Sequence, residues 1–252
     1  MDYGKVISQE SLSKDIYSLW IKTDMCADAK CGQFVNVYTK NSSKLLPRPI
    51  SICEIDRDNN ALRLVYRVTG ENTGTYEFSK LNSGDTIRLL GTLGNGFPLD
   101  SKSTMLIGGG IGIPPMLECA KEINGEKIIV LGFRDSDTFL VDEFKKYGKV
   151  YIATEDGSMG TGGNVLDAIA EQKLFAERIL ACGPTPMLRA LKAYAAKNNI
   201  ECFLSLEERM ACGIGACLAC TCKSKDVDSH TNVNNKRVCS EGPVFNALEV
   251  EL

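Results

Sequence analysis

The first hundred positions of the chain alternate between hydrophobic and polar residues in short segments, with turn-forming Asn, Asp and Gly between them. In the clearest segment every second residue from Leu62 to Val68 is hydrophobic, and the residues between them, apart from Val65, are polar. This period of two predicts a half-buried antiparallel strand. Further strands are expected near Val6 and at positions 17–21, 34–38, 50–55 and 86–89. So many short strands predict a small antiparallel β-barrel over residues 1–99.

Beyond Ser101 the pattern changes to hydrophobic runs that alternate with amphipathic stretches of helical period. In the first of these stretches Met116, Cys119, Ala120 and Ile123 share one helical face. This alternation predicts βαβ units and a mostly parallel sheet in an α/β domain over residues 100–204. The expected strands are Thr104–Ile107, Lys127–Phe133, Lys149–Thr154, Arg178–Cys182 and Ile200–Leu206.

The remaining residues, 205–252, are rich in cysteine and are interrupted by a polar stretch from Lys223 to Lys236. We expect a small third domain here, with the polar stretch as a surface loop. The single histidine, His230, lies in this stretch without a serine or cysteine partner, so we interpret it as a solvated residue. No hydrolytic site is indicated.

Composition narrows the classes of function. The chain has 252 residues, of which 44% are hydrophobic, so it can bury ordinary globular cores. Its net charge of −3 and the lack of a Lys or Arg cluster argue against nucleic-acid binding. Its apolar runs are too short to span a membrane, and Met1 to Val6 does not resemble a secretory signal. We therefore expect a cytoplasmic protein.

Four cysteines within eleven positions form the most informative motif. Cys212, Cys217 and Cys220 have the spacing C-x4-C-x2-C, which is typical of plant-type [2Fe–2S] proteins and requires a fourth thiolate from elsewhere. Cys239 is the preferred fourth ligand. Cys222 is the rival, but it follows Cys220 after one residue, so in an extended segment its side chain would point the same way.

The cysteines have two other possible roles, a structural zinc site and a disulfide framework. A structural zinc site usually has two C-x2-C pairs, and this region has only Cys217 with Cys220. A disulfide framework is typical of small secreted domains, which this chain does not resemble. The iron–sulfur interpretation is favoured. The other seven cysteines are expected to be small buried residues: Cys26, Cys31, Cys53, Cys119, Cys182, Cys202 and Cys222.

A glycine-rich turn from Gly108 to Pro115 follows the first expected strand of the α/β domain and precedes a helix. Such a turn lets a diphosphate approach the backbone, and open α/β sheets bind ligands at this edge. We expect a nucleotide at Gly109, Gly110 and Gly112. Cys182 and Gly183 end a later strand in the same way and are candidates for the same site, although taken alone they could be only a turn and a helix cap. A proline where the third glycine of a Rossmann motif belongs argues against an ordinary dehydrogenase.

The barrel carries a second set of candidate residues. Arg48, Pro49, Ile50 and Ser51 combine a permanent cation and a hydroxyl at the start of a strand. Taken alone, this motif is most simply an edge strand with a solvated arginine. Val65, Tyr66 and Arg67 on the next strand precede a glycine-rich turn that contains Thr73, Gly74 and Thr75. Together these segments could hold a flavin and its diphosphate.

Five motifs of the chain resemble, in kind and in order, those of the ferredoxin–NADP reductase-like flavoproteins: the arginine strand, the Tyr66-Arg67 strand with its turn, the glycine-rich turn, Cys182-Gly183-Pro184 and the cysteine pattern. The segments 210–220 and 238–245 are most similar to the electron-transfer subunits of type B dihydroorotate dehydrogenase, the PyrK family. The resemblance covers essentially the whole chain, and the C-terminal motif is its most specific part.

This resemblance implies an FAD-binding barrel, an NAD-binding α/β domain and a [2Fe–2S] domain in that order. It implies that Arg48–Ser51, Val65–Arg67 and Thr73–Thr75 contact FAD and that Cys212, Cys217, Cys220 and Cys239 hold the cluster. In the family, electrons pass from the FMN of a catalytic PyrD subunit through the cluster and FAD to NAD+, as part of pyrimidine biosynthesis. The expected assembly is a heterotetramer with two chains of each kind.

Two alternatives remain open from the sequence. The chain also resembles the flavin subunit of an NADPH-dependent ferredoxin transhydrogenase or sulfide dehydrogenase, which shares the fold and the order of motifs. A redox sensor that binds another protein without turnover is an alternative of a different class. Nothing in the chain resembles the (β/α)8 barrel that would oxidise dihydroorotate, so that reaction is expected in a partner.

Overall fold

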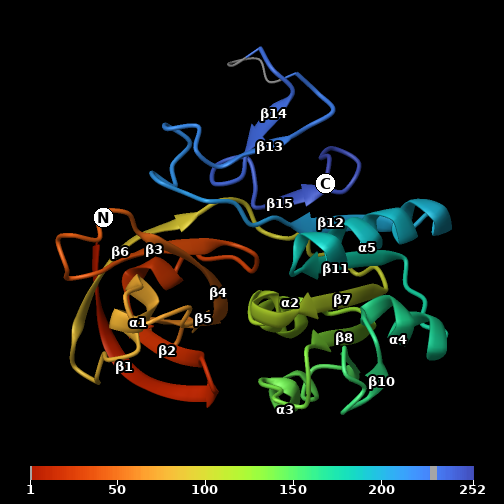
Figure 1. Ribbon diagram of the computed structural model, residues 1–252, viewed down its shortest axis with the longest axis horizontal. Helices are drawn as coiled ribbons and strands as arrows, with labels where there is room; N and C mark the ends of the chain where they lie inside the picture. Colours follow the sequence, from red (N-terminus) through yellow and green to blue (C-terminus); the bar gives the residue numbers. More distant parts are fainter. Residues whose placement is uncertain (1, 228–231) are drawn as a thin grey trace.

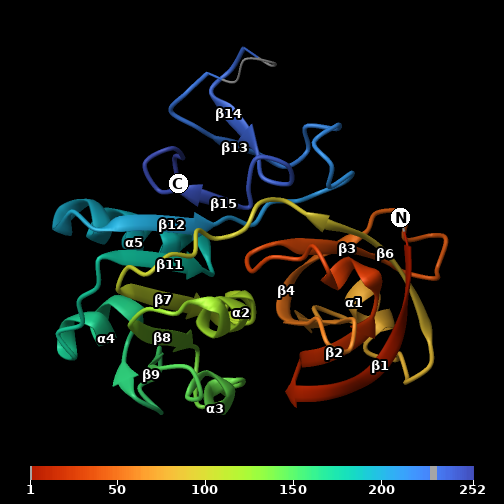
Figure 2. The ribbon, with the colours of Figure 1, turned by 180° about the vertical axis from the view of Figure 1, so that it is seen from behind.

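The structure is a computed structural model that describes residues 2–227 and 232–252. Figure 1 shows a barrel formed by the N-terminal part, an α/β sheet formed by the middle of the chain, and a C-terminal segment that lies against both. Figure 2 shows the same arrangement from behind. Within the described ranges, no helix has the length and hydropathy needed to cross a bilayer. His230 lies outside the described residues.

The N-terminal part is a closed barrel in which all neighbouring strands are antiparallel, as the alternating pattern predicts. The strand order is β1-β2-β5-β4-β3-β6. A short helix, α1 (Gly74–Phe78), follows β5, and a 3-10 turn (Asp24–Cys26) follows β2. The strands are β1 (Asp2–Ser13), β2 (Ile16–Lys22), β3 (Phe34–Tyr38), β4 (Arg48–Asp56), β5 (Ala61–Arg67) and β6 (Thr86–Leu93).

The expectation that the β5 strand is half-buried was wrong, because six of its seven residues are buried. Its second face packs against the α/β domain. There Arg63, only 4% exposed, donates to Glu54 of β4 at 2.6 Å and to Glu143 of the next domain at 2.5 Å. Two carboxylates and the hydroxyl of Ser18 satisfy the buried guanidinium, so an arginine can lie in the interface between the domains.

The second part is a seven-stranded sheet in the order β10-β9-β8-β7-β11-β12-β15. The first six strands are parallel to their neighbours, as predicted, and only β15 is antiparallel. The strands are β7 (Thr104–Gly109), β8 (Lys127–Phe133), β9 (Lys149–Thr154), β10 (Thr161–Gly162), β11 (Arg178–Cys182), β12 (Glu201–Ser205) and β15 (Val244–Asn246).

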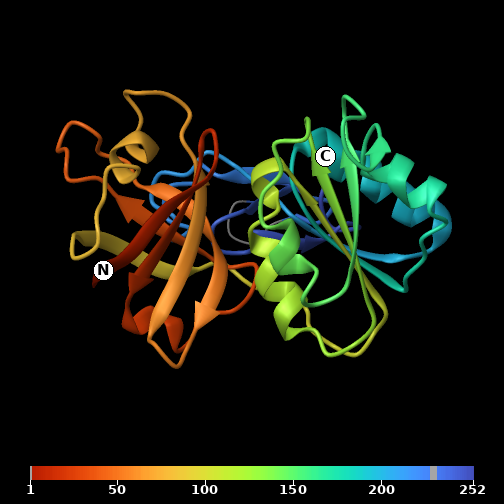
Figure 3. The ribbon, with the colours of Figure 1, turned by 90° about the horizontal axis from the view of Figure 1, so that it is seen from below.

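Helices cover both faces of this sheet (Figure 3). On the face toward the barrel, α2 and α3 enclose one hydrophobic cluster, and on the other face α4 and α5 enclose a second. A 3-10 turn at Gly110–Gly112 separates β7 from α2. The helices are α2 (Pro115–Glu122), α3 (Val141–Phe144), α4 (Val165–Glu171) and α5 (Thr185–Asn198).

The C-terminal segment shares a core with the α/β sheet. After the cysteine-rich loop, β13 (Thr221–Lys223) and β14 (Asn235–Arg237) form an antiparallel pair, and the chain then returns to β12 as β15. Cys220, Cys239 and Phe245 belong to the same hydrophobic cluster as Leu204 of β12. The cysteine-rich loop is therefore fixed between a sheet edge and the barrel.

Candidate functional site

The barrel is locally open between β4 and β5, where the sequence motifs of the flavin site lie. Pairing between these strands runs from Asp56↔Ala61 to Ile52↔Leu64 and does not continue in the described chain. Beyond this point Arg48–Ser51 pairs only with β3, and Val65–Arg67 only with β2. The two predicted segments therefore border the same opening, and each has a strand edge without a partner strand there.

The turn after β5 brings a third predicted segment to Arg48. Thr73 caps α1 by accepting from the backbone N–H of Tyr76 at 3.2 Å. A Cβ built on Gly74 would lie 2.7 Å from Nε of Arg48, so the guanidinium rests against the glycine backbone. Arg48 also donates to the carbonyl of Leu46. A cation beside backbone N–H groups at the start of a helix is a suitable cradle for a diphosphate.

Two of the predicted flavin residues do not present their side chains to this opening. Tyr66 is 2% exposed, and its hydroxyl donates to Oε1 of Gln9 at 2.7 Å within the barrel. Its ring packs against Tyr17 and Phe78. Val65 is buried in the cluster that contains α2. At these two positions only the backbone can contact a flavin.

The two predicted nucleotide turns press against each other at the carboxyl edge of the α/β sheet. β7 and β11 are neighbours, with Gly108 opposite Cys182, and the strand order reverses between them. A Cβ on Gly112 would lie 2.5 Å from the backbone N of Gly183, and one on Gly183 would lie 3.1 Å from Cα of Gly109. Only glycine allows the two backbones to approach this closely. The carboxyl edge of the sheet between β7 and β11, where the strand order reverses, is therefore lined by backbone without side chains, and open α/β sheets bind ligands at such a position.

The flavin and nucleotide residues converge where the two domains meet. Gly110, at φ +52°, reaches Arg67 at the end of β5, and a Cβ on this glycine would lie 3.9 Å from Nη2 of the arginine. Hydride transfer requires the two ring systems to touch, so this convergence satisfies a geometric condition for such chemistry.

The four predicted cluster cysteines form two pairs in the C-terminal segment. The thiol of Cys217 is near enough to that of Cys212 to contribute to lowering its pKa, and the thiol of Cys220 is near enough to that of Cys239 to contribute to raising its pKa. Among the described residues, no three His, Cys, Asp or Glu side chains converge to hold a single metal ion. Two thiol pairs match a binuclear cluster with two cysteines on each iron better than a mononuclear zinc site.

Backbone N–H groups point at these sulfurs. Gly215 donates to Sγ of Cys239 at 3.1 Å, Cys239 to Sγ of Cys220 at 3.4 Å and Ile214 to Sγ of Cys212 at 3.5 Å. Glycine makes this loop possible, because Gly213 and Gly215 have φ of +72° and +82°. Such donors stabilise negative charge on thiolate sulfur, as ligands to iron require.

The thiols differ in how readily they ionise. Partial burial raises the pKa of Cys212, but the N–H groups of Ile214, Cys217 and Ala216 and the Cys217 thiol outweigh it and lower this pKa to about 6. Burial, followed by the contact with Cys220, raises the pKa of Cys239 to about 12. Cys212 therefore ionises more readily than Cys239.

Cys222, the rival ligand, is buried on β13 opposite Lys236 of β14, and burial raises its pKa to about 11. Sγ of Cys239 accepts from the backbone N–H of Gly215 in the cysteine loop, so Cys239 stays the predicted fourth thiolate. All seven cysteines expected to be buried are buried.

Asn36 of β3 is a site residue that the sequence did not reveal. It is fully buried, and its Nδ2 donates to the carbonyl of Cys212 at 3.3 Å. A barrel residue therefore anchors the cysteine loop across 176 positions of the chain. A lone asparagine in a strand carries no recognisable signal, because its role depends on a contact between distant segments.

Comparison with known proteins agrees with the class that this geometry defines. The barrel and sheet have the fold of ferredoxin–NADP reductases: a solved ferredoxin–NADP+ reductase from Neisseria gonorrhoeae covers 78% of this chain and 90% of its own at a TM-score of 0.65 and 15% identity. A structure of the NADH-dependent reduced ferredoxin–NADP oxidoreductase matches 100% of this chain and 90% of its own at a TM-score of 0.88 and 27% identity.

Sequence comparison then identifies the family. A model of an oxidoreductase FAD-binding domain matches residues 3–97, and a model of the iron–sulfur cluster binding domain of dihydroorotate dehydrogenase B matches residues 207–251. The electron transfer subunit of dihydroorotate dehydrogenase B from Listeria monocytogenes is 44% identical over 98% of both chains. That from Fusobacterium nucleatum is 43% identical over 96% of this chain and 95% of its own. The chain belongs to the family of dihydroorotate dehydrogenase B electron transfer subunits.

Proposed function

We propose that this chain is the electron-transfer subunit of an NAD-dependent dihydroorotate dehydrogenase and transfers electrons from a catalytic partner to NAD+. The observation that carries the proposal is the identity of 44% over 98% of both chains with a subunit of that name. The paired cysteines, the opening in the barrel and the glycine turns at the sheet edge are the sites that such a function requires.

The flavin site comprises Arg48, Pro49, Ile50, Ser51, Val65, Tyr66, Arg67, Thr73, Gly74 and Thr75. When bound, FAD exchanges a hydride with nicotinamide and single electrons with an iron–sulfur cluster. Arg48 and the N–H groups that follow Thr73 hold the diphosphate by charge and hydrogen bonds. The edges of β4 and β5 that lack a partner strand would offer backbone hydrogen-bond donors and acceptors to the flavin.

The nucleotide site comprises Gly109, Gly110, Gly112, Cys182 and Gly183. These residues let NAD(H) lie against bare backbone at the sheet edge and bring the nicotinamide toward the flavin beside Arg67. The first turn also precedes α2, whose N-terminal end favours the negative charge of the diphosphate.

The cluster site comprises Cys212, Cys217, Cys220 and Cys239, whose four thiolates would hold a [2Fe–2S] cluster. The N–H groups of Ile214, Gly215 and Cys239 stabilise the charge on the sulfurs and so tune the reduction potential.

The partner in this proposal is an FMN-containing PyrD subunit that oxidises dihydroorotate, in a cytoplasmic heterotetramer with two chains of each kind. The family membership implies a catalytic subunit, and the stoichiometry follows the resemblance. A flavin subunit of a ferredoxin transhydrogenase is the second candidate, supported by the TM-score of 0.88. The identity of 27% with that protein, against 44% with the dihydroorotate subunits, favours the first.

The test begins with the anaerobically purified chain. Extraction is expected to release FAD, and assays are expected to give about two iron and two sulfide per chain. The chain alone should oxidise NADH with an artificial acceptor and should not form orotate from dihydroorotate. Addition of the FMN-containing subunit should produce NAD+-dependent dihydroorotate oxidation. Orotate formation by the isolated chain, or a colourless protein that contains zinc, would refute the proposal.

A further inference from the structure

Two asparagines attach the cysteine segment to the barrel, one beside Cys212 and one beyond Cys239. On the first side, Nδ2 of Asn36 in β3 donates to the carbonyl of Cys212 at 3.3 Å. On the second side, Asn95, just after β6, donates to the carbonyl of Val244 at 2.9 Å and accepts from its backbone N–H at 3.0 Å. The barrel therefore holds this segment near each of the two thiol pairs.

Asn36 also belongs to the strand that pairs with the proposed flavin segment. In the antiparallel register of β3 and β4 it lies directly opposite Pro49, with about 4.5–5.5 Å between the Cα atoms of such a pair. Directly opposite residues share one face of a sheet, and Pro49 is exposed on that face. One strand pair and one hydrogen bond therefore connect the flavin segment to the backbone of Cys212.

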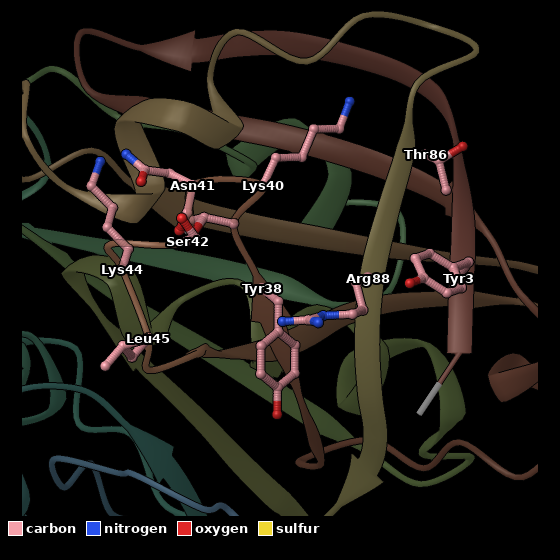
Figure 4. Close-up of a pocket in the computed structure, with 10 residues that line it drawn as sticks. Tyr3, Tyr38, Lys40, Asn41, Ser42, Lys44, Leu45, Thr86 and Arg88 are labelled. Carbon is pink, nitrogen blue, oxygen red and sulfur yellow. The ribbon is translucent and has the colours of Figure 1, made fainter.

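The strand that carries Asn36 is a rigid support. β3 is paired along both edges, with β4 on one side and β6 on the other. At its end the guanidinium of Arg88 in β6 lies 4.4 Å from the centre of the Tyr38 ring (Figure 4). A side chain on a strand fixed in this way is positioned more precisely than one on a loop. Asn36 thus gives the cysteine loop a fixed reference on the barrel.

The loop fits closely onto the Asn36 amide. A Cβ on Gly213, the residue after Cys212, would lie 2.2 Å from Nδ2 of Asn36. The backbone of the loop therefore rests directly on the amide group, which only a glycine permits. A displacement of this amide would move the backbone that carries the Cys212 thiol.

Packing alone does not account for an asparagine at this position. Its side chain is fully buried, and within the described residues its Oδ1 accepts no hydrogen bond. A buried acceptor without a partner has a cost that an apolar side chain of the same shape avoids. The neighbours Phe34, Val35 and Val37 are buried hydrophobic residues. What the amide adds at this cost is the hydrogen bond to Cys212.

We propose that Asn36 is a positioning residue that fixes the separation between the flavin and the [2Fe–2S] cluster and so sets the rate of electron transfer between them. The proposal rests on the proposed function. NADH gives FAD two electrons as a hydride, and one of them then passes to the oxidised cluster, so that the cluster is reduced by one electron and the flavin is oxidised by one. Asn36 carries no electron and acts through the position of Cys212.

The experiment mixes the cofactor-loaded chain with NADH in the absence of oxygen. Bleaching of the flavin absorption gives the rate of flavin reduction, and EPR of samples frozen at successive times gives the rate of cluster reduction. Asn36→Leu keeps the shape of the side chain but removes the donor, while Asn95 still holds the other side, so FAD and cluster should be retained. The ratio of the cluster rate to the flavin rate should fall about 10-fold or more, because a small displacement of reacting groups has a large effect on rate.

A second EPR measurement reports the separation itself. The magnetic interaction between the one-electron-reduced flavin and the reduced cluster weakens with distance, so it should be weaker in Asn36→Leu. The reduction potential of the cluster should change little, because Asn36 bonds a carbonyl and not a sulfur. Asn36→Ser, whose smaller side chain cannot clash with Gly213, should show the same two effects.

Asn82→Leu is the matched control. Asn82 is exposed on the same barrel, and its hydrogen bonds are to Lys80 and Asp85 of its own turn, so the ratio should stay at the wild-type value. A wild-type ratio in both Asn36 variants would overturn the positioning proposal, as would a lower ratio with an unchanged magnetic interaction. Loss of the cluster from both variants would assign Asn36 to cluster assembly and overturn it too. A wild-type chain that binds no FAD or no cluster would instead contradict the proposed function.

Discussion

The substitution Gly74→Ala is expected to weaken FAD binding without disturbing the fold of the barrel. In Gly74→Ala the new carbon would lie 2.7 Å from Nε and 2.9 Å from Cζ of Arg48. These atoms belong to a flexible, partly exposed side chain, so the arginine moves and the backbone does not. The φ of Gly74 is not in the left-handed region, and alanine at the start of α1 favours the helix by up to about 1 kcal/mol.

The expected magnitude follows from the contact that is lost. A charge-assisted hydrogen bond contributes about 1.5–3 kcal/mol, and displacement of the Arg48 guanidinium removes such a bond to the diphosphate. The Kd for FAD should therefore rise about 10- to 150-fold. The free energy of unfolding of the flavin-free protein should change by less than about 1 kcal/mol.

Fluorescence titration of the flavin-free chain with FAD measures the first quantity, and urea unfolding measures the second. Arg48→Ala should weaken FAD binding to a similar extent, and the double variant should be no weaker than Arg48→Ala, because both changes remove one interaction. Full FAD affinity in Gly74→Ala, together with a loss in Arg48→Ala, would refute the proposed cradle.

Three further predictions concern the other sites. Cys239→Ser should lose the cluster, whereas Cys222→Ser should keep about two iron per chain; iron and sulfide assays decide, and the reverse result would make Cys222 the ligand. Gly112→Ala places a Cβ within 2.5 Å of the backbone N of Gly183, so it should lower the free energy of unfolding by about 1–3 kcal/mol. It should also reduce NADH oxidation without lowering the FAD content. Unchanged NADH kinetics would contradict the nucleotide site. Burial raises the pKa of the Glu118 carboxyl above its ordinary value of 4.5. Above about pH 4.5 the folded state therefore keeps a proton that the unfolded state releases. The free energy of unfolding should accordingly fall as the pH rises above about 4.5. Urea unfolding of Glu118→Gln should lack this slope, and an equal slope in both proteins would assign it to other groups.

Much of the fold could be predicted from local patterns. The alternation from Leu62 to Val68 predicted β5, and three of the α/β strands begin and end where the hydrophobic runs do: Lys127–Phe133, Lys149–Thr154 and Arg178–Cys182. These patterns are informative because side-chain period and strand burial are local properties. The short pairs β13 with β14 and β15 with β12 were not predicted, since three residues carry too little periodicity.

The amino-acid sequence by itself determined the chemistry of this protein: three cysteines at iron–sulfur spacing with a fourth further along, glycine-rich turns after hydrophobic strands, and an arginine at the start of a strand. Only the tertiary structure decided which groups face one another. It buries Tyr66 and Val65, so their backbone alone remains for the flavin, and it places Arg63 in an interface where two carboxylates neutralise it. It also sets Asn36 beneath Cys212 and directs Cys222 into the core. The reason is physical: residue type and spacing fix what a group can do, but burial and contacts between distant segments depend on how the whole chain packs.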